Sequence, residues 1–254
     1  MRTNTLKAKL AAGGDVVGVL LTVQNAELVE LFGHLGYDFV FIDAQHGGVG
    51  VETARELIRA AELTGMTPLV RVPRNEPSVI LDYLEIGAGG IIVPNVMRRA
   101  DAEGAVRAIK YAPLGNRGNM PISRAGFYGV TQSSAEYMTR ANQETLFLPI
   151  LEDQEVLDVL PEVIGVEGVD AVLVGPGDLA LSMGIPGGWS DPRVQAGVDR
   201  IVEAARAGSK PAMIVPLDVE DGRRLRERGF QGLIVISGPL IAEAAREFLQ
   251  GLRA

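Results

Sequence analysis

Eight short, strongly apolar segments alternate along this chain with eight longer amphipathic segments. Each apolar run is nearly continuous in hydrophobic residues, which is typical of strands covered on both faces of a parallel sheet. The runs are Val17 to Thr22, Asp38 to Asp43, Pro68 to Val72, Gly90 to Pro94, Leu146 to Leu151, Asp170 to Val174, Pro211 to Val215 and Gly232 to Ser237. This alternation predicts an α/β protein with a parallel sheet.

The segments between the runs carry apolar residues at helical spacing. They are Ala26 to Leu35, Val51 to Thr64, Val79 to Ile86, Ala100 to Lys110, Val156 to Ile164, Pro192 to Ala207, Val219 to Arg228 and Leu240 to Leu252. Eight strand–helix units in 254 residues predict a (β/α)8 TIM barrel that forms one domain over residues 1–254. A doubly wound open sheet gives the same alternation and is the competing fold.

Charge and cysteine content restrict the possible partners. The chain has 24 Lys and Arg against 32 Asp and Glu, a formal net charge of −8, and no Cys. Nucleic acid and anionic membranes attract positive surfaces, so this balance disfavours both as partners. The sequence lacks an apolar run near the roughly 20 residues that span a bilayer, and its polar start lacks a signal-peptide core. We therefore expect a cytoplasmic protein that acts on small molecules.

Two acidic residues follow neighbouring predicted strands, where a barrel forms its active site. Glu152 follows the fifth run, and Asp178 comes shortly after the sixth. Two carboxylates that meet there, with water in the remaining positions, suit Mg²⁺ or Mn²⁺. Each residue also has a plainer interpretation, because Asp178 can cap the helical segment that follows it, and Glu152 precedes a helix whose positive end favours acids.

His46 and Arg71 stand at the same predicted mouth. His46 follows the second run, where an imidazole can act as a general acid or base, and a structural histidine is the alternative. Arg71 ends the third run, and its planar guanidinium can hold a carboxylate or phosphate. The alternative for Arg71 is an ion pair with Asp43 or Glu152.

Two other chemistries are disfavoured. The four lysines, Lys7, Lys9, Lys110 and Lys210, lie away from the predicted carboxyl ends of the strands, which argues against a Schiff base. The stretch from Gly175 to Ala180 formally matches a dinucleotide-binding fingerprint, but it follows the sixth strand, and Asp178 would repel a pyrophosphate. The backbone N–H groups of that turn can instead receive a small carboxylate.

Five segments, taken in order, resemble the HpcH/HpaI aldolase family. They are Phe41-Ile42-Asp43-Ala44-Gln45-His46-Gly47, Val70-Arg71-Val72-Pro73, Gly90-Ile91-Ile92-Val93-Pro94, Tyr111-Ala112-Pro113-Leu114-Gly115-Asn116-Arg117-Gly118 and Val174-Gly175-Pro176-Gly177-Asp178-Leu179. The likeness extends from about residue 18 to residue 238. It implies a (β/α)8 barrel, a divalent metal, and the making or breaking of carbon–carbon bonds with pyruvate as the enolate-forming partner.

The resemblance also implies roles for individual residues. Glu152 and Asp178 are expected to bind the metal, which is Mg²⁺, Mn²⁺ or Co²⁺. Arg71 is expected to hold the pyruvyl oxygens, and Gly177 with Asp178 to receive the pyruvate carboxylate. His46 is expected to handle protons.

Asp43 and Glu85 complete the expected catalytic set, and three positions differ from the family's usual pattern. Gln45 stands where a Glu commonly precedes the catalytic histidine, and Glu85 stands where an Asp commonly supports that histidine. A Gln usual shortly before the metal-binding Glu is missing around Ile150. These differences concern the proton relay and the exact reaction, and they leave the expected metal ligands in place.

The expected activity is metal-dependent, reversible cleavage of a 4-hydroxy-2-oxo acid to pyruvate and an aldehyde. The alternatives are a 2-oxo acid lyase or condensing enzyme with the same enolate chemistry, such as an oxaloacetate decarboxylase or a citrate-synthase-like enzyme, and a non-catalytic binding barrel. The resemblance further implies a homo-oligomer, expected to be a hexamer. The long irregular stretch from Tyr111 to Ser133 is expected to cover a site near a subunit boundary.

Overall fold

Eight parallel strands form a closed barrel in the computed structural model, which describes residues 1–253. The strands are β1 (Val16–Leu20), β2 (Phe39–Asp43), β3 (Thr67–Arg71), β4 (Gly90–Val93), β5 (Leu146–Leu151), β6 (Val172–Val174), β7 (Ala212–Ile214) and β8 (Gly232–Ile236). The (β/α)8 barrel is confirmed, and the open sheet is excluded, because β1 pairs with β8 as well as with β2.

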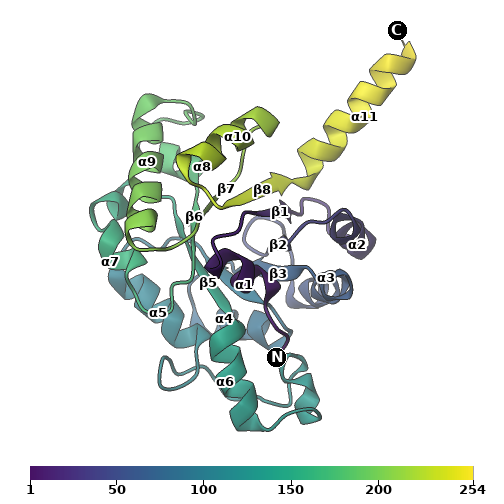
Figure 1. Cartoon of the computed structure of the whole chain (residues 1–254), viewed down its shortest axis with the longest axis vertical. Helices are drawn as coiled ribbons and strands as arrows, with labels where there is room; N and C mark the ends of the chain where they lie inside the picture. The colour runs from purple at the N-terminus through teal and green to yellow at the C-terminus, as the bar shows by residue number, and fades with distance from the viewer. Residues whose placement is uncertain (254) are drawn as a thin grey trace.

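Helices surround the barrel (Figure 1). They are α2 (Ala26–His34), α3 (Val51–Thr64), α4 (Pro77–Glu85), α5 (Arg99–Ile109), α7 (Leu160–Ile164), α8 (Pro176–Ser182), α9 (Pro192–Ala207) and α10 (Val219–Arg228). The helix predicted from Val156 to Ile164 is divided into a 3-10 turn, Gln154–Asp158, and α7. Pro161 in the first turn of α7 lacks the N–H that a continuous helix needs, which explains the division.

Four elements were not among the segments predicted from the periodicity. They are α1 (Thr5–Ala11), α6 (Ser134–Glu144), the short helix α8 and the 3-10 turn η1 (Arg124–Gly129). For α6 the sequence did hold a signal, because Ser133 and Glu136 form a capping box at its start. Short or polar helices of this kind lack a wide apolar face, so hydrophobic spacing does not reveal them.

The inside of the barrel is filled by alternate strand residues, and their neighbours face the helices. In β2, Phe39 and Phe41 belong to the inner cluster, whereas Val40 and Ile42 pack in the outer layer. The Phe39 ring lies against Gly18 of β1, where an added Cβ would be 2.2 Å from a ring carbon. The aromatic side chains inside the barrel therefore require glycine at that point of the neighbouring strand.

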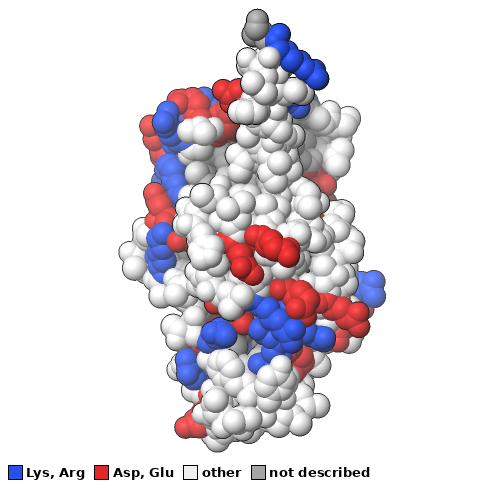
Figure 2. Space-filling model, turned by 90° about the vertical axis from the view of Figure 1, so that its right-hand side faces the viewer, with Lys and Arg blue, Asp and Glu red and all other residues white. Residues whose placement is uncertain are grey.

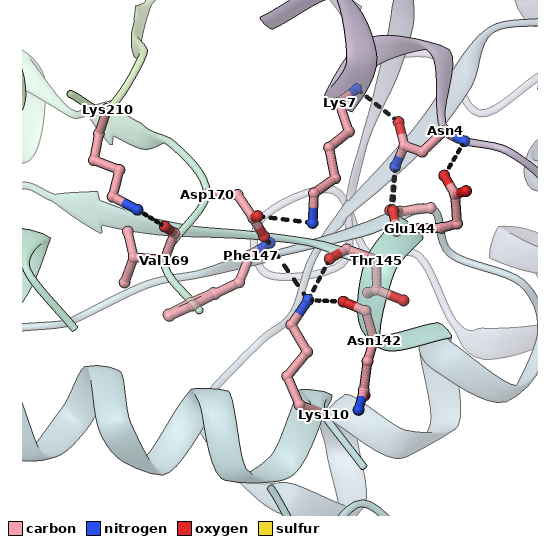
Figure 3. A network of polar contacts seen from close by, with 11 residues as sticks. Asn4, Lys7, Lys110, Asn142, Glu144, Thr145, Phe147, Val169, Asp170 and Lys210 are labelled. Atoms are coloured by element: carbon pink, nitrogen blue, oxygen red, sulfur yellow. Dashed lines mark hydrogen bonds and ion pairs between the residues drawn. The ribbon is translucent and has the colours of Figure 1, made fainter. Parts of the chain in front are cut away.

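A buried polar network closes the amino-terminal end of the barrel (Figure 3). Lys110 donates to the carbonyl oxygens of Asn142 at 2.9 Å and Thr145 at 2.7 Å, and Lys7 pairs with Asp170 at 2.8 Å. Burial lowers the pKa of Lys110 to about 8, although the charge of Asp170 acts in the opposite direction. These lysines are engaged far from the carboxyl ends of the strands, as expected.

The irregular stretch from Tyr111 to Ser133 also lies at the amino-terminal end. It follows helix α5 and leads through α6 to the start of β5, and its residue Arg124 donates to the carbonyl oxygen of Ile86, just before β4, at 2.9 Å. The stretch therefore lies away from the mouth of its own chain, and its expected place over a site near a subunit boundary stays a prediction. A segment between a helix and the next strand begins at the opposite end of the barrel from the mouth.

The last helix, α11 (Ser237–Arg253), does not pack on the barrel. It leaves the body of the molecule after β8 and extends away from it (Figure 1). Within the described chain only Ser237 of this helix is buried. None of the helices in residues 1–253 combines the length and apolarity needed to cross a membrane.

Candidate active site

Asp43 and Arg71 form a buried ion pair at the carboxyl ends of β2 and β3, where the sheet register places them side by side. Asp43 accepts hydrogen bonds from Arg71 Nε at 2.9 Å and Nη2 at 2.6 Å. It also accepts from the backbone amides of Gln45 and His46, at 3.0 and 3.2 Å. Burial alone would raise the pKa of Asp43, but Arg71 and the two amides outweigh burial and leave that pKa lowered. Of the two ion-pair partners considered for Arg71, the structure shows Asp43.

Glu152 and Asp178 come together at the carboxyl ends of β5 and β6. Glu152 is 9% exposed, and its Oε1 accepts the backbone N–H of Asn95 at 3.2 Å. Burial raises the pKa of Glu152; the charge and side-chain contact of Asp178 raise it as well, while the Asn95 amide and the charge of Arg71 act in the opposite direction. The structure therefore places the two predicted metal ligands in contact, beside Arg71.

The pair of carboxylates fits a divalent cation. Burial and the neighbouring Asp178 outweigh the charge of Arg71 and leave the pKa of Glu152 raised, and carboxylate oxygens are the ligands that Mg²⁺ and Mn²⁺ prefer. Within residues 1–253 no third His, Cys, Asp or Glu joins them in a metal-binding group. A cation held by Glu152 and Asp178 would thus keep positions for water and an oxygen-bearing substrate.

His46 lies exposed in the turn after β2, on the same side of the barrel as this pair. The turn is tight, because a Cβ at Gly47 would lie 2.3 Å from the carbonyl oxygen of Asp43. The side chain of Gln24 borders the same turn, and its buried Oε1 has no hydrogen-bond partner in the described chain. The hydrogen bond from the His46 backbone N–H to the Asp43 side chain therefore links the turn that carries the imidazole to the ion pair between Asp43 and Arg71.

The turn expected to receive a carboxylate is covered by the protein's single tryptophan. A Cβ at Gly177 would lie 2.9 Å from Trp189 Nε1, so the indole packs directly over this glycine. Asp178 stands next to it in the first turn of α8. The neighbouring acid Asp153 has a different task, because its side chain caps the following 3-10 turn by accepting the N–H of Glu155 at 2.8 Å.

Glu85 lies away from His46. It ends α4, at the amino-terminal side of the barrel, and its Oε1 is 3.3 Å from Nη2 of Arg117. Arg117 is almost fully buried, donates to the Tyr137 hydroxyl at 3.0 Å and stacks on the Tyr111 ring. Within one chain the predicted support of His46 by Glu85 is therefore not formed, because α4 runs from the mouth to the opposite end.

The sequence alone had assigned no role to Gln24, Asn95 or Trp189, although Gln24 and Asn95 follow predicted strands. Asn95 follows β4 with a left-handed backbone, φ 55°, and its N–H donates to Glu152 at 3.2 Å. Its position after a predicted strand was a usable signal. Trp189 lies in the connection between α8 and α9, and no spacing rule links it to Gly177.

A comparison with protein families matches residues 17–235 to the HpcH/HpaI aldolase/citrate lyase model. The chain belongs to this family. The family that the sequence motifs indicated is thereby confirmed.

Individual proteins similar to this chain include one aldolase and two solved structures. A 5-keto-4-deoxy-D-glucarate aldolase of Escherichia coli O139:H28 (strain E24377A / ETEC) is 34% identical over 226 residues, covering 89% of this chain and 87% of the relative. A solved HpcH/HpaI aldolase/citrate lyase family protein from Burkholderia cenocepacia J2315 superposes with a TM-score of 0.94 at 28% identity, covering 99% of this chain and 100% of that one. The citrate synthase SbnG gives a TM-score of 0.87 at 30% identity, covering 98% and 97%.

Proposed function

We propose that this protein is a metal-dependent aldolase that reversibly cleaves a 4-hydroxy-2-oxo acid to pyruvate and an aldehyde. The contact between Glu152 and Asp178, with Arg71 beside it, is the observation that carries the proposal. Two carboxylates and one arginine at a barrel mouth suit a substrate with adjacent carboxylate and carbonyl oxygens. Membership of the HpcH/HpaI family and the 34% identity to an aldolase support the same reaction.

The groups at the mouth divide the chemistry between them. A divalent ion held by Glu152 and Asp178 would act as a Lewis acid toward the 2-oxo acid. Arg71, fixed by Asp43, places positive charge where negative charge develops on the pyruvyl oxygens. His46 accepts the proton of the 4-hydroxyl group as the carbon–carbon bond breaks, and the turn at Gly177 receives the carboxylate.

A second outcome of the same enolate chemistry is condensation or decarboxylation. The similarity to the citrate synthase SbnG, at 30% identity over 98% of this chain, favours this as the second candidate. Oxaloacetate, as a 2-oxo acid, presents the same pair of oxygens to the metal and Arg71. Aldol cleavage and this second reaction would then differ in the molecule that reacts with the enolate, and not in the use of Glu152 and Asp178.

Product analysis separates the candidates. The protein with Mg²⁺ or Mn²⁺ is incubated with 5-keto-4-deoxy-D-glucarate and simpler 4-hydroxy-2-oxo acids, and pyruvate and aldehyde are measured. We expect both products in equal amounts, together with aldol formation from pyruvate and an aldehyde. Citrate formation from oxaloacetate and acetyl-CoA without any retro-aldol activity would favour the second candidate, and inactivity in all assays would contradict an enzymatic role.

We also propose a homo-oligomer, and α11 supports it. Ile241, Ala245, Phe248 and Leu252 recur at steps of four, three and four residues, so they lie on one face of the helix. Of these, Phe248 is 72% and Leu252 73% exposed. An exposed apolar helix face of this kind marks a site of contact with another surface.

The surface that a second copy of α11 would cover is the outside of β8. Every residue of β5 is buried, whereas Leu233 and Val235, on the outward face of β8, remain half-buried in the described chain, where α11 does not pack back on them. If two copies exchanged α11, the apolar face of each α11 would cover the outside of β8 in the other copy. The two contacts would be identical, as a two-fold interface requires. The hexamer implied by the family resemblance would then assemble from such dimers.

Light scattering and sedimentation test the oligomer. Phe248→Glu places a charge in the apolar face of α11 and should shift the protein toward monomers, whereas Glu243→Lys, a charge change outside that face, should leave the assembly intact. An unchanged assembly in Phe248→Glu would contradict the exchange of α11. A monomeric wild-type protein at micromolar concentration would contradict the oligomer itself.

The expected partners and location remain proposals of the same kind. Pyruvate and an aldehyde are the proposed small-molecule partners, and the net charge of −8 supports the absence of nucleic acid from that set. The lack of cysteine suits a cytoplasmic protein, which has no use for disulfides.

A further inference from the structure

A cavity of about 690 Å³ opens at the amino-terminal end of the barrel, opposite the mouth. The residues before β3 and β4 form its floor, with Gly65 and Gly89 among them. Its walls come from the first residues of the chain, from α3, from α6 and from the irregular stretch that contains Phe127. Small-molecule sites in proteins occupy about 300 to 1,000 Å³, so this space is large enough for a metabolite and too small for a macromolecule.

Four arginines line the cavity against one carboxylate. They are Arg2, Arg59, Arg124 and Arg140, and the carboxylate is Glu62. In a protein with a net charge of −8 this is a local reversal of sign. On the side of the molecule that carries α2 and α3, Lys and Arg side chains gather in the lower half of the surface, next to a group of acidic side chains (Figure 2).

Glu62, the carboxylate that lines the cavity, is already paired with two of the arginines. Glu62 receives both terminal nitrogens of Arg124 and also pairs with Arg2 Nε at 3.2 Å. Among residues 1–253 the one ion pair of Arg59 is with Glu56 on its own helix, where both side chains are about half exposed and the pair is weak, and the Tyr128 hydroxyl is its other polar neighbour. Arg140 forms no ion pair in the part of the chain that the structure describes, and it donates to the Thr3 hydroxyl at 3.3 Å.

The backbone beside the arginines is held in an unusual conformation. Phe127 and Tyr128 line the cavity, and both have left-handed backbones, with φ of 54° and 57°. Bulky residues rarely adopt this conformation, and such positions cluster at ligand-binding sites. The Arg2 guanidinium lies 6.0 Å from the centre of the Phe127 ring, so the strained segment helps to hold one of the cationic groups at the rim.

We propose that this cavity binds a small anion with two or more negative charges, of the class of phosphate monoesters or dicarboxylates. The arginine guanidinium binds carboxylates and phosphates through paired hydrogen bonds. An anion in this cavity would therefore bind the guanidiniums that have no strong carboxylate partner. Arg140 and Arg59 are the two that remain available. The site is separate from the mouth, so it does not depend on the proposed aldolase activity.

Titration calorimetry on the full chain tests the site. Inorganic phosphate and succinate are titrated at constant ionic strength into protein treated with EDTA, so that no metal at the mouth recruits the anion. We expect binding of at least one of them, and Arg140→Gln or Arg59→Gln should weaken it about tenfold, the usual effect of losing one charged hydrogen bond. Tighter phosphate binding would indicate a phosphate monoester, and tighter succinate binding a dicarboxylate.

Arg223→Gln is the matched control, because it removes one exposed arginine of α10 that pairs only with Glu220 on the same helix. Its affinity should stay within about twofold of the wild type. Circular dichroism shows whether each variant is folded. Absence of binding by the folded wild-type protein overturns the proposal. Equal affinity in all four proteins also overturns it, since the anion would then bind elsewhere as an adventitious ion only.

Discussion

Arg71 and Asp43 are joined by two hydrogen bonds across the ends of neighbouring strands, from Nε at 2.9 Å and from Nη2 at 2.6 Å. Phe41 lies beneath the guanidinium, with its ring centre 5.4 Å away. Nη1 has no partner among residues 1–253, so it is the nitrogen that remains available to substrate oxygens. Asp43 is therefore a positioning residue, which acts by fixing the arginine.

Asp43→Ala should lower the free energy of unfolding by about 3 to 5 kcal/mol, because it leaves the guanidinium of Arg71 buried without its partner. Urea unfolding followed by circular dichroism measures this change. Glu220→Ala, which breaks an exposed pair with Arg223, should change stability by less than about 1 kcal/mol. Equal losses in the two variants would contradict the importance of burial.

The contribution of Asp43 should depend on pH. Its pKa in the folded protein is lowered from 3.8, so its stabilising effect is present above that value and is lost as the pH falls through the folded-state pKa. The difference in unfolding free energy between wild type and Asp43→Ala should therefore be constant near neutral pH and shrink below about pH 4. Urea titrations across this range check the sign, and a difference that grows in acid would contradict it.

Glu152 should be required for metal binding, and Asp153 should not. Treatment with EDTA is expected to abolish aldol cleavage, and Mg²⁺, Mn²⁺ or Co²⁺ to restore it. Glu152→Gln should lose metal binding in calorimetry and most of its activity, whereas Asp153→Asn should bind metal normally, because Asp153 caps the next turn. Full activity of the metal-free protein, or equal loss in both variants, would refute the ligand assignment.

His46 and Arg71 should be separable by the reactions they affect. Arg71→Ala should slow aldol cleavage and oxaloacetate decarboxylation alike by about 10² to 10³, because both develop charge on the same oxygens. His46→Ala should slow cleavage by about 10² to 10⁴ and spare decarboxylation, which removes no hydroxyl proton. Steady-state kinetics on both substrates measure the split. Cleavage within about threefold of wild type in His46→Ala would end its proposed role.

Trp189 should report occupation of the mouth. Because its indole lies over Gly177, binding of pyruvate with Mg²⁺ is expected to change the intrinsic fluorescence of this single tryptophan. Gly177→Ala would place a methyl group against the indole and should weaken pyruvate binding and displace the ring. Gly187→Ala, in the same connection but with an unobstructed Cβ position, is the matched variant for space, although its left-handed backbone adds local strain.

The sequence by itself determined the strand–helix alternation and the residues that follow each strand. Continuous apolar runs are a local property, and the predicted Leu146–Leu151, Val51–Thr64 and Pro192–Ala207 agree with the observed elements at both ends. Consecutive parallel strands end at the same edge of a sheet, so the alternation already placed Glu152 and Asp178 at one edge, and the closure of the barrel made that edge a mouth.

Only the tertiary structure decided the partners of these residues. The sequence left Arg71 between Asp43 and Glu152, and the strand register selected Asp43. Glu85 was expected beside His46, yet the length of α4 carries it to the opposite end, where Arg117 holds it. The sequence also did not show the direction in which α11 leaves the barrel. The same holds for the cavity lined by Arg2, Arg59 and Arg140, because these residues come from segments far apart in the chain. Periodicity records which face of an element is buried, whereas such contacts depend on how the elements are arranged in space.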